Sequence, residues 1–226
     1  MNIIVSGASK GIGYQLALQA AELGHNVLAI ARNVELLGKL EAKNDLITAL
    51  RVDLISDDCS ESILSWVDGV GKVDALINNA GQLINKPFIE TSSTDFKNQY
   101  DANMVTVIKL TQAVIPVMNK GAHVLNITSM GGFQGSSKYA GLSAYSSSKG
   151  ALSVLTECLA EELKEYAISV NALALGAVQT EMLENAFPGY KAPVSAAEMA
   201  EYVLDFASKG HKFYNGQILP VAIGNP

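Results

Sequence analysis

Cysteine is scarce in this chain: only Cys59 and Cys158 occur among 226 residues. Two cysteines are too few for a disulfide framework, and their separation does not match the spacing of metal ligands. We therefore expect no metal site, and a reducing environment such as the cytoplasm.

Long apolar runs are also missing. No window approaches the ~18 uninterrupted apolar residues that a membrane-spanning helix requires. The opening residues Met1 to Ser6 lack the basic region and apolar stretch of a secretory signal. The sequence predicts a soluble, cytoplasmic protein with no membrane partner.

The chain also has no excess of basic residues. Sixteen Lys and Arg stand against 22 Asp and Glu, giving a formal charge of −6. This balance argues against a broad nucleic-acid surface but leaves a local anion site open. Hydrophobic residues make up 49% of the chain, which excludes disorder. The length favours one domain over residues 1–226.

Short apolar runs alternate with segments of helical periodicity along the chain. Strands are predicted at Ile3–Ser6, Asn26–Ala31, Ala49–Asp53, Ala75–Asn78, His123–Thr128, Ser169–Ala174 and Gln217–Val221. Helices are predicted at about Gly13–Leu23, Val34–Lys43, Asp57–Val70, Asp95–Met118, Ser143–Tyr166 and Ala196–Ser208. The least patterned stretch, Glu184–Val194, is expected to be a loop.

The predicted strands are rich in Val, Ile and Leu and do not alternate with polar residues. Such strands are typically covered on both faces. Repeated strand–helix alternation predicts an α/β fold: a doubly wound, Rossmann-like, mostly parallel seven-stranded sheet with helices on both faces.

A glycine-rich loop, Gly7-Ala8-Ser9-Lys10-Gly11-Ile12-Gly13, follows the first predicted strand. Glycine permits positive φ and close approach of backbone N–H groups to a ligand. The next helix directs its N-terminus to the same place, where a phosphate is favoured. We interpret the loop as a dinucleotide site, the alternative being a tight turn without a ligand.

Two further strand ends should face the same ligand. In a doubly wound sheet, ligands lie across the carboxyl ends of the strands where the strand order reverses. Asp53 ends the third predicted strand, and Asn78-Asn79-Ala80-Gly81 follows the fourth. The Asn-Asn-Ala-Gly run is also compatible with a simple turn, but its position favours binding.

The end of the second predicted strand indicates which dinucleotide is preferred. An acid there accepts the ribose hydroxyls of NAD, whereas an arginine accommodates the 2′-phosphate of NADP. This chain has Ala31-Arg32-Asn33 and no acid, and Lys10 supplies a second cation. We expect NADP(H), with NAD(H) as the less favoured alternative.

Tyr145 and Lys149 lie four residues apart at the start of a predicted helix, so their side chains share one face. Ser129, at the end of the fifth predicted strand, points to the same cleft. Together with the glycine loop, these residues resemble the short-chain dehydrogenase/reductase family, in its compact single-domain branch, over essentially the whole chain.

The resemblance implies a role for each matching residue. Asn103, Ser129, Tyr145 and Lys149 match the family's catalytic residues. Its cofactor-binding positions correspond to Gly7, Ser9, Lys10, Gly11, Ile12, Gly13, Arg32, Asp53, Asn79, Ala80, Gly81, Tyr145, Lys149, Val178 and Thr180. It further implies that Lys149 binds the nicotinamide ribose, that Asn103 holds a proton-relaying water, and that Ser129 orients the substrate oxygen.

The implied chemistry is physically reasonable. Reducing a carbonyl requires a hydride, which only a cofactor can supply, and a proton. A tyrosine has a reference pKa near 10, and lowering it by ~3 units takes about 4 kcal/mol. One ammonium ~4 Å away at an effective dielectric of ~20 supplies about that much. We therefore expect Lys149 to lower the pKa of Tyr145.

Two departures from the family pattern stand out. Ser129 and Tyr145 are separated by 16 positions instead of the family's roughly twelve, which indicates a short insertion near Lys138–Ala140. The inserted stretch leaves Ser136, Ser137 or Ser143 as alternatives to Ser129. Leu175 replaces the proline that usually follows the sixth strand.

The resemblance also implies a substrate lid at about 181–194, where Met182, Leu183, Phe187 and Tyr190 either cover the substrate or pack on the fold. We expect the substrate to be a small carbonyl or alcohol, with sugars, acyl thioesters, pterins and xenobiotic carbonyls all left open. The long helices near 95–118 and 143–166 resemble those through which family members form homodimers or homotetramers. A non-catalytic dinucleotide sensor is the alternative function.

Overall fold

The computed structural model describes residues 1–223; the last three positions of the predicted domain, 224–226, lie outside the described residues. Seven parallel strands form one sheet in the order β3-β2-β1-β4-β5-β6-β9. Their bounds are β1 Asn2–Ser6, β2 Asn26–Ala31, β3 Ile47–Arg51, β4 Val73–Asn78, β5 Met118–Ser129, β6 Ser169–Leu175 and β9 Ile218–Val221. The predicted doubly wound, seven-stranded sheet is confirmed.

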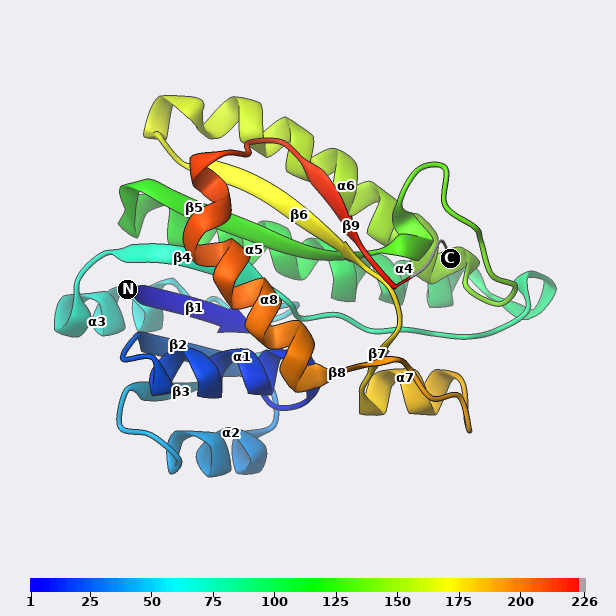
Figure 1. The fold of residues 1–226 in the computed structure, drawn as a ribbon, viewed down its shortest axis with the longest axis horizontal. Coiled ribbons are helices and arrows are strands. Elements are labelled where there is room, and N and C mark those ends of the chain that lie inside the picture. Colours follow the sequence, from blue (N-terminus) through cyan, green and yellow to red (C-terminus); the bar gives the residue numbers. More distant parts are fainter. Residues whose placement is uncertain (224–226) are drawn as a thin grey trace.

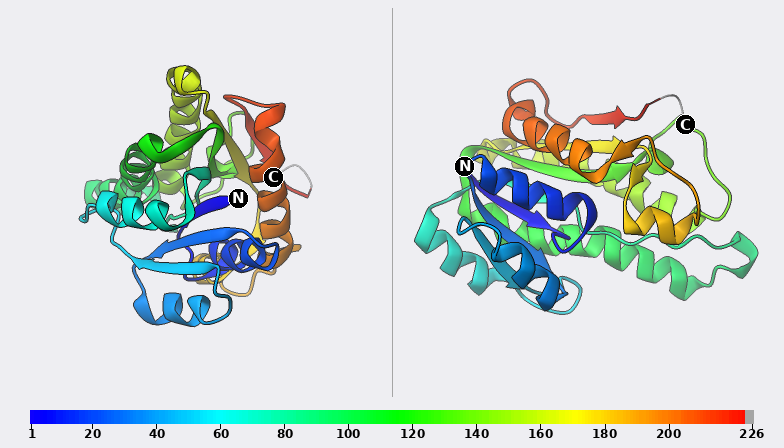
Figure 2. Two further views of the ribbon diagram at one scale, coloured as in Figure 1. Left: turned by 90° about the vertical axis from the view of Figure 1, so that its left-hand side faces the viewer. Right: turned by 60° about the horizontal axis from the view of Figure 1, so that its bottom comes forward.

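Helices cover both faces of this sheet (Figures 1 and 2). Residues of α1 (Gly11–Glu22), α2 (Val34–Glu41) and α8 (Ala196–Lys209) share one buried core with the sheet. Residues of α3 (Ser60–Val70), α5 (Thr106–Val114) and α6 (Ser143–Glu162) contribute to the core of the opposite face. The two cores stabilise the sheet from both sides.

Alternate residues of one strand enter opposite cores. Ile3 and Val5 of β1 pack with α1 and α8, whereas Ile4 packs with α3 and α5, and all three are fully buried. This explains why the strand sequences contain no polar alternation: each face of the strand is covered.

The predicted helix over 95–118 is wrong in its details. The structure has α4 (Ser93–Tyr100), a π-helical turn (Asp101–Val105), α5 and a 3₁₀ turn (Ile115–Val117), and Met118 begins β5. Pro116, which has no backbone N–H, lies in the 3₁₀ turn, where the helix ends. Strand β5 accordingly starts five residues before the predicted position.

The loop predicted at 184–194 is also partly wrong. Helix α7 (Glu181–Ala186) occupies its start, and β7 (Val178–Gln179) pairs with β8 (Val194–Ser195) at its end. The Oγ1 atom of Thr180 accepts a hydrogen bond from the backbone of Leu183 and caps α7. Six helical residues give too short a periodic pattern to be recognised in the sequence. The predicted third strand ended at Asp53, but β3 ends at Arg51, so Asp53 lies two residues beyond the strand.

Candidate active site

A cleft of about 1230 Å³ runs along the carboxyl ends of the strands. The strand order reverses beside β1, as expected for a ligand site in a doubly wound sheet. The predicted cofactor residues that line it are Gly7, Ser9, Lys10, Gly11, Ile12, Arg32, Asp53, Asn79, Ala80, Gly81, Tyr145, Lys149, Val178 and Thr180. Of the predicted catalytic residues, Ser129, Tyr145 and Lys149 line it. Gly13 and Asn103 do not.

The glycine loop is shaped by close contacts that side chains would prevent. Gly7 has φ +69°, and a Cβ there would lie 2.8 Å from the Cα of Ala80. A Cβ on Gly13 would lie 2.4 Å from the Gly7 carbonyl oxygen and 2.5 Å from Nδ2 of Asn79. Gly13 therefore acts behind the loop, by allowing it to pack, and not on the cleft surface.

Asn79 fastens this loop to the end of β4. Its Nδ2 donates to the backbone carbonyl of Ser6 at 3.0 Å. The backbone N–H groups of Asn79 and Ala80 both donate to Oγ of Ser6 at 3.1 Å. Ser6, which sequence reasoning missed, thus joins β1 to the Asn-Asn-Ala-Gly segment by accepting these three hydrogen bonds.

The loop fits the phosphates of a dinucleotide. No side chain caps the N-terminus of α1, and no acidic residue lies in its first turn, so its first N–H groups are free to face an anion. Lys10 and Arg32 are exposed and form no ion pair among residues 1–223. Asn33 accepts a hydrogen bond from the Leu36 backbone and caps α2.

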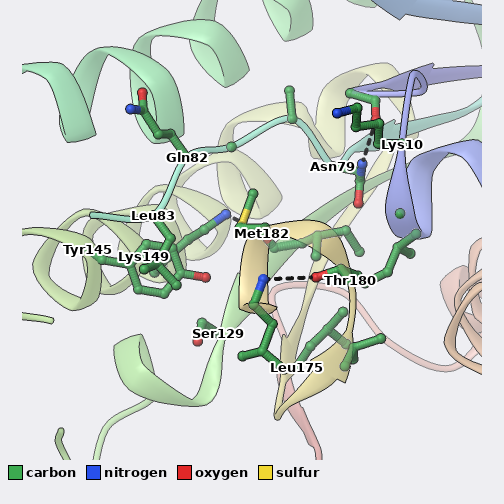
Figure 3. Close-up of a pocket in the computed structure, with 18 of the residues that line it drawn as sticks. Lys10, Asn79, Gln82, Leu83, Ser129, Tyr145, Lys149, Leu175, Thr180 and Met182 are labelled. Carbon is green, nitrogen blue, oxygen red and sulfur yellow. Dashed lines mark hydrogen bonds between the residues drawn. The ribbon is translucent and has the colours of Figure 1, made fainter. Parts of the chain in front are cut away.

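Ser129, Tyr145 and Lys149 lie together at the opposite end of the cleft from Lys10 and Asn79 (Figure 3). Ser129 comes from the end of β5, and Tyr145 from the first turn of α6. The Ser129 side chain lies close enough to Tyr145 to influence the pKa of its phenol, and the Ser129 Oγ accepts a hydrogen bond from the Gly131 backbone at 3.1 Å.

Lys149 is a buried cation. It is 4% exposed, and its Nζ donates to the Ile127 carbonyl at 2.8 Å. Burial lowers the pKa of Lys149 from 10.5 to about 8, so the side chain stays mostly protonated at neutral pH. A Cβ on Gly81 would lie 3.4 Å from this Nζ and 2.9 Å from Oδ1 of Asn103, so glycine is required where the three segments meet.

The expected lowering of the Tyr145 pKa is not what the structure gives. Burial raises the pKa of the Tyr145 phenol above its ordinary value of 10, while the neighbouring Ser129 side chain partly opposes this. The Lys149 ammonium is directed to the Ile127 carbonyl and does not offset the burial. In this state the phenol is a proton donor.

Asn103 is fully buried within the π-helical turn that interrupts the helix after β4. Its Oδ1 accepts from the backbone N–H of Gln82 at 2.8 Å, and its Nδ2 donates to the Gln82 carbonyl and to Oγ of Ser148. Such π turns often occur at functional sites. The side chain fixes the segment after Gly81, and the water-holding role expected of Asn103 stays a prediction.

The position of each serine relative to the cleft distinguishes Ser129 from its three alternatives. Ser136 hydrogen-bonds within its own loop, to the Phe133 carbonyl among others. Ser136, Ser137 and Ser143 do not line the cleft, whereas Ser129 does. Of these four serines, only Ser129 is placed to contact a ligand in the cleft, and its role toward substrate stays a prediction.

A family model described as short chain dehydrogenase matches residues 1–191. The chain belongs to this family. The 7alpha-hydroxysteroid dehydrogenase of Escherichia coli strain K12 is 30% identical over 239 residues, covering 98% of this chain and 92% of that protein. An NADPH-dependent pterin aldehyde reductase of Arabidopsis thaliana is 33% identical over 212 residues, covering 87% of this chain and 86% of that one.

The fold agrees with that membership. A crystal structure of a short-chain dehydrogenase/reductase from Brucella melitensis superposes with a TM-score of 0.87 at 23% identity, covering 97% of this chain and 94% of the other. The protein is therefore an oxidoreductase of the short-chain dehydrogenase/reductase family.

Asn78, which we expected to face the ligand with Asn79 to Gly81, does not line the cleft and belongs instead to a buried amide network that sequence reasoning missed. Asn78 Nδ2 donates to Asn126 Oδ1 at 2.9 Å, and Asn126 Nδ2 donates to Thr156 Oγ1 at 2.9 Å. Thr128 Oγ1 donates to the Lys149 carbonyl at 2.8 Å. Polar residues inside otherwise apolar strands were the available signal, since buried polar groups need partners.

The far wall of the cleft is formed by α7 and the residues after it. Thr180 lies against the glycine loop, because a Cβ on Gly11 would be 3.2 Å from its Cγ2. Met182 and Tyr190 line the cleft and are 42% and 50% exposed. These side chains do not simply pack into the fold.

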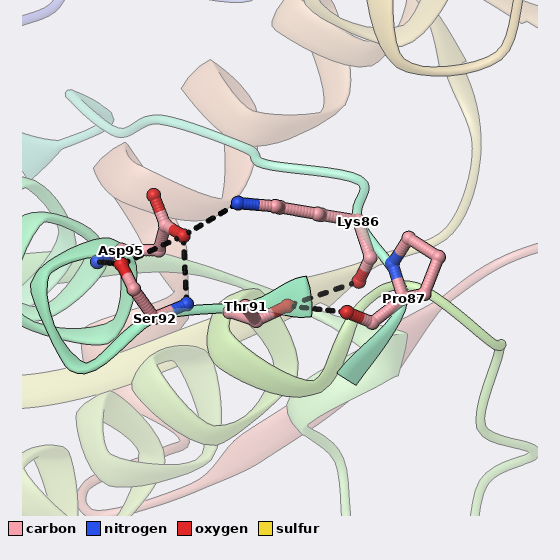
Figure 4. A network of polar contacts seen from close by, with 5 residues as sticks. All are labelled: Lys86, Pro87, Thr91, Ser92 and Asp95. Atoms are coloured by element: carbon pink, nitrogen blue, oxygen red, sulfur yellow. Dashed lines mark hydrogen bonds and ion pairs between the residues drawn. The ribbon is translucent and has the colours of Figure 1, made fainter. Parts of the chain in front are cut away.

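The connection between β4 and α4 is tied down by a second polar network (Figure 4). Lys86 pairs with Asp95 at 3.0 Å, and Asp95 also accepts from Ser92 in a capping box at the start of α4. Thr91 Oγ1 donates to the Pro87 carbonyl at 2.9 Å.

No helix among residues 1–223 has the length and apolarity to cross a membrane, and no group of three metal-ligating side chains occurs there.

Proposed function

We propose that the protein interconverts a ketone or aldehyde and the corresponding alcohol using NADP(H), with Tyr145 transferring the proton. The observation that carries this proposal is the meeting of Ser129, Tyr145 and Lys149 in the cleft that also holds the glycine loop. A dinucleotide bound along the loop would bring a reactive ring to these three side chains.

The cofactor preference rests on charge. Lys10 and Arg32 line the nucleotide end of the cleft and pair with no carboxylate in the part of the chain that the structure describes, and β2 is followed directly by Arg32-Asn33 and not by an acid. Two free cations favour the 2′-phosphate of NADP over the ribose hydroxyls of NAD. The name of the Arabidopsis relative also states NADPH dependence.

Each polar group then has a task in reduction. NADPH, when bound, supplies the hydride. Ser129 donates a hydrogen bond to the substrate oxygen and orients it. Tyr145, whose pKa is raised by burial, holds the proton that this oxygen takes up. Lys149 keeps a positive charge near the phenol, and Asn103 holds the segment after Gly81 in place.

Replacing Tyr145 by Phe tests the proton transfer. We expect kcat/KM for NADPH-dependent ketone reduction to fall by about 10²-fold or more, since general acid catalysis contributes that much. NADPH affinity, measured by fluorescence titration, should change little. Unchanged turnover in Tyr145→Phe would contradict the proposal. Tight NADPH binding by wild type without oxidation of NADPH by any carbonyl would favour the sensor alternative.

Replacing Arg32 by Asp tests the cofactor preference. The carboxylate should repel the 2′-phosphate and accept ribose hydroxyls, so NADPH binding should weaken by about tenfold or more while NADH binding strengthens. Isothermal titration with both cofactors measures this, and Arg51→Asp, an exposed change on the next strand that does not line the cleft, is the control. Wild-type preference for NADH would refute the NADP assignment.

We also propose a domain organisation, a cellular location and an oligomeric state for the enzyme. Residues 1–226 act as one NADP(H)-binding domain, with 181–194 as the substrate lid, in the cytoplasm. The long segments α4–α5 and α6 provide the surfaces for a homodimer or homotetramer, which are common arrangements. Light scattering after size-exclusion chromatography measures the assembly.

A further inference from the structure

Charged side chains occupy only part of the cleft. Of the described residues that line it, five are charged: Lys10, Arg32, Asp53, Lys149 and Glu181. Lys10, Arg32 and Asp53 lie at the nucleotide end, on the glycine loop and after β2 and β3. Glu181 also faces the loop, because its Oε2 lies 3.8 Å from the position of a Cβ on Gly11.

Lys149 is the remaining charge, and it is not free to pair with a substrate anion. Its ammonium is buried and donates to the Ile127 carbonyl. Within residues 1–223, the part of the cleft beyond Ser129 and Tyr145 is therefore lined without an accessible charged side chain.

Apolar and aromatic side chains from three separate segments surround this part of the cleft. They are Leu83, Met130, Tyr139, Leu142, Met182, Leu183, Phe187 and Tyr190. Tyr139, from the inserted stretch, is 53% exposed, and Met182 and Tyr190 are 42% and 50% exposed. Large apolar side chains exposed around the mouth of a cleft are typical of a binding site for an apolar molecule.

We infer that the substrate is an uncharged carbonyl compound with an apolar body, such as an aryl or alkyl ketone or aldehyde, and not a carboxylated or phosphorylated one. This inference rests on the proposed reductase function. An anionic substrate would lose its hydration in the cleft with no cation to replace it. An apolar body would cover Tyr139, Met182 and Tyr190 instead.

Two ketones that differ only in one substituent test this inference. With NADPH and the wild-type protein, kcat/KM for para-methylacetophenone should exceed that for para-acetylbenzoate by at least about tenfold. Met182→Lys places a cation on α7 at the cleft and should narrow this ratio about fivefold or more. Glu184→Gln, on the same helix but not lining the cleft, makes the same change in net charge and should leave the ratio unchanged.

Binding of unreactive analogues separates substrate class from catalysis. The protein loaded with NADPH is titrated calorimetrically with para-methylbenzamide and with para-carbamoylbenzoate. Tighter binding of the neutral amide supports the inference even if no ketone is reduced, an outcome that would overturn only the reductase function. Equal or tighter binding of the anion, or an equal or higher kcat/KM for the acetylbenzoate, would overturn the inference while leaving the reductase function intact.

Discussion

The buried charge of Lys149 lowers the stability of the fold, although the proposed reaction requires it. Its ammonium is 4% exposed, and burial holds its pKa at about 8 instead of 10.5. At ~1.36 kcal/mol per unit, keeping this charge in the fold at neutral pH costs about 3 kcal/mol. Lys149→Met keeps the stem and removes the charge. We expect its free energy of unfolding at pH 7 to rise by about 1–3 kcal/mol while ketone reduction is lost.

The pH dependence provides the check on that prediction. Between pH 8 and 10.5 the unfolded lysine binds a proton that the folded one does not, so this group makes wild-type stability rise with pH. Urea denaturation at pH 7 and pH 10 should show the advantage of Lys149→Met shrinking as the pH rises. A variant that is less stable than wild type at both pH values would contradict this reading of the burial.

At the scale of elements, Asn85 connects the two walls of the substrate end. Its Nδ2 donates to the Ala186 carbonyl at the end of α7, at 2.8 Å. The next residue, Lys86, donates its backbone N–H to the Gly141 carbonyl at 2.9 Å. We expect Asn85→Ala to release α7 and to raise KM for a ketone about threefold to tenfold, in line with the loss of one hydrogen bond, with NADPH affinity unchanged.

A change in the same connection gives the control for Asn85. Lys86→Gln breaks the partly exposed ion pair with Asp95 but leaves the bond from Asn85 to α7. Exposed pairs contribute about 0–1 kcal/mol, so its KM should stay near the wild-type value. Equal KM changes in both variants would mean that the connection as a whole, and not Asn85, holds α7.

At the scale of the whole molecule, buried His123 makes stability depend on pH. Asn171 Nδ2 lies 3.0 Å from its Nε2, and its Nδ1 lies 3.0 Å from the Ala207 carbonyl, so the neutral ring satisfies both contacts. Burial lowers the pKa of His123 from 6.5 to about 4. Between those values the unfolded chain binds a proton that the folded one excludes, so stability falls as the pH falls from 6.5 to 4, by about 3 kcal/mol.

Urea denaturation from pH 7.5 to pH 4.5 measures this loss. His123→Gln removes the titrating ring and should flatten the curve, although its stability at pH 7.5 will be lower. His25→Gln, which removes a histidine near the surface, should keep most of the slope. A slope that persists unchanged in His123→Gln would assign the acid sensitivity to other groups, such as His211, whose ring lies 5.5 Å away.

The sheet and one end of the site were determined by the sequence itself. Continuous apolar runs such as Ile3–Val5 require cover on both faces, and that requirement predicts the parallel sheet. The glycine loop and Asn79–Gly81 follow neighbouring strands, so the carboxyl-end geometry brings them together regardless of other details. Tyr145 and Lys149 share a face because helical periodicity is local.

Tertiary structure alone decided the protonation chemistry and the lid. The pKa of Tyr145 depends on how deeply the phenol is enclosed and on where the Lys149 ammonium points, and both follow from packing between β5 and α6. The burial of Asn103 and the short helix α7 likewise arise from contacts between distant segments. Periodicity and spacing record local geometry, whereas desolvation depends on every atom that surrounds a group in the folded chain.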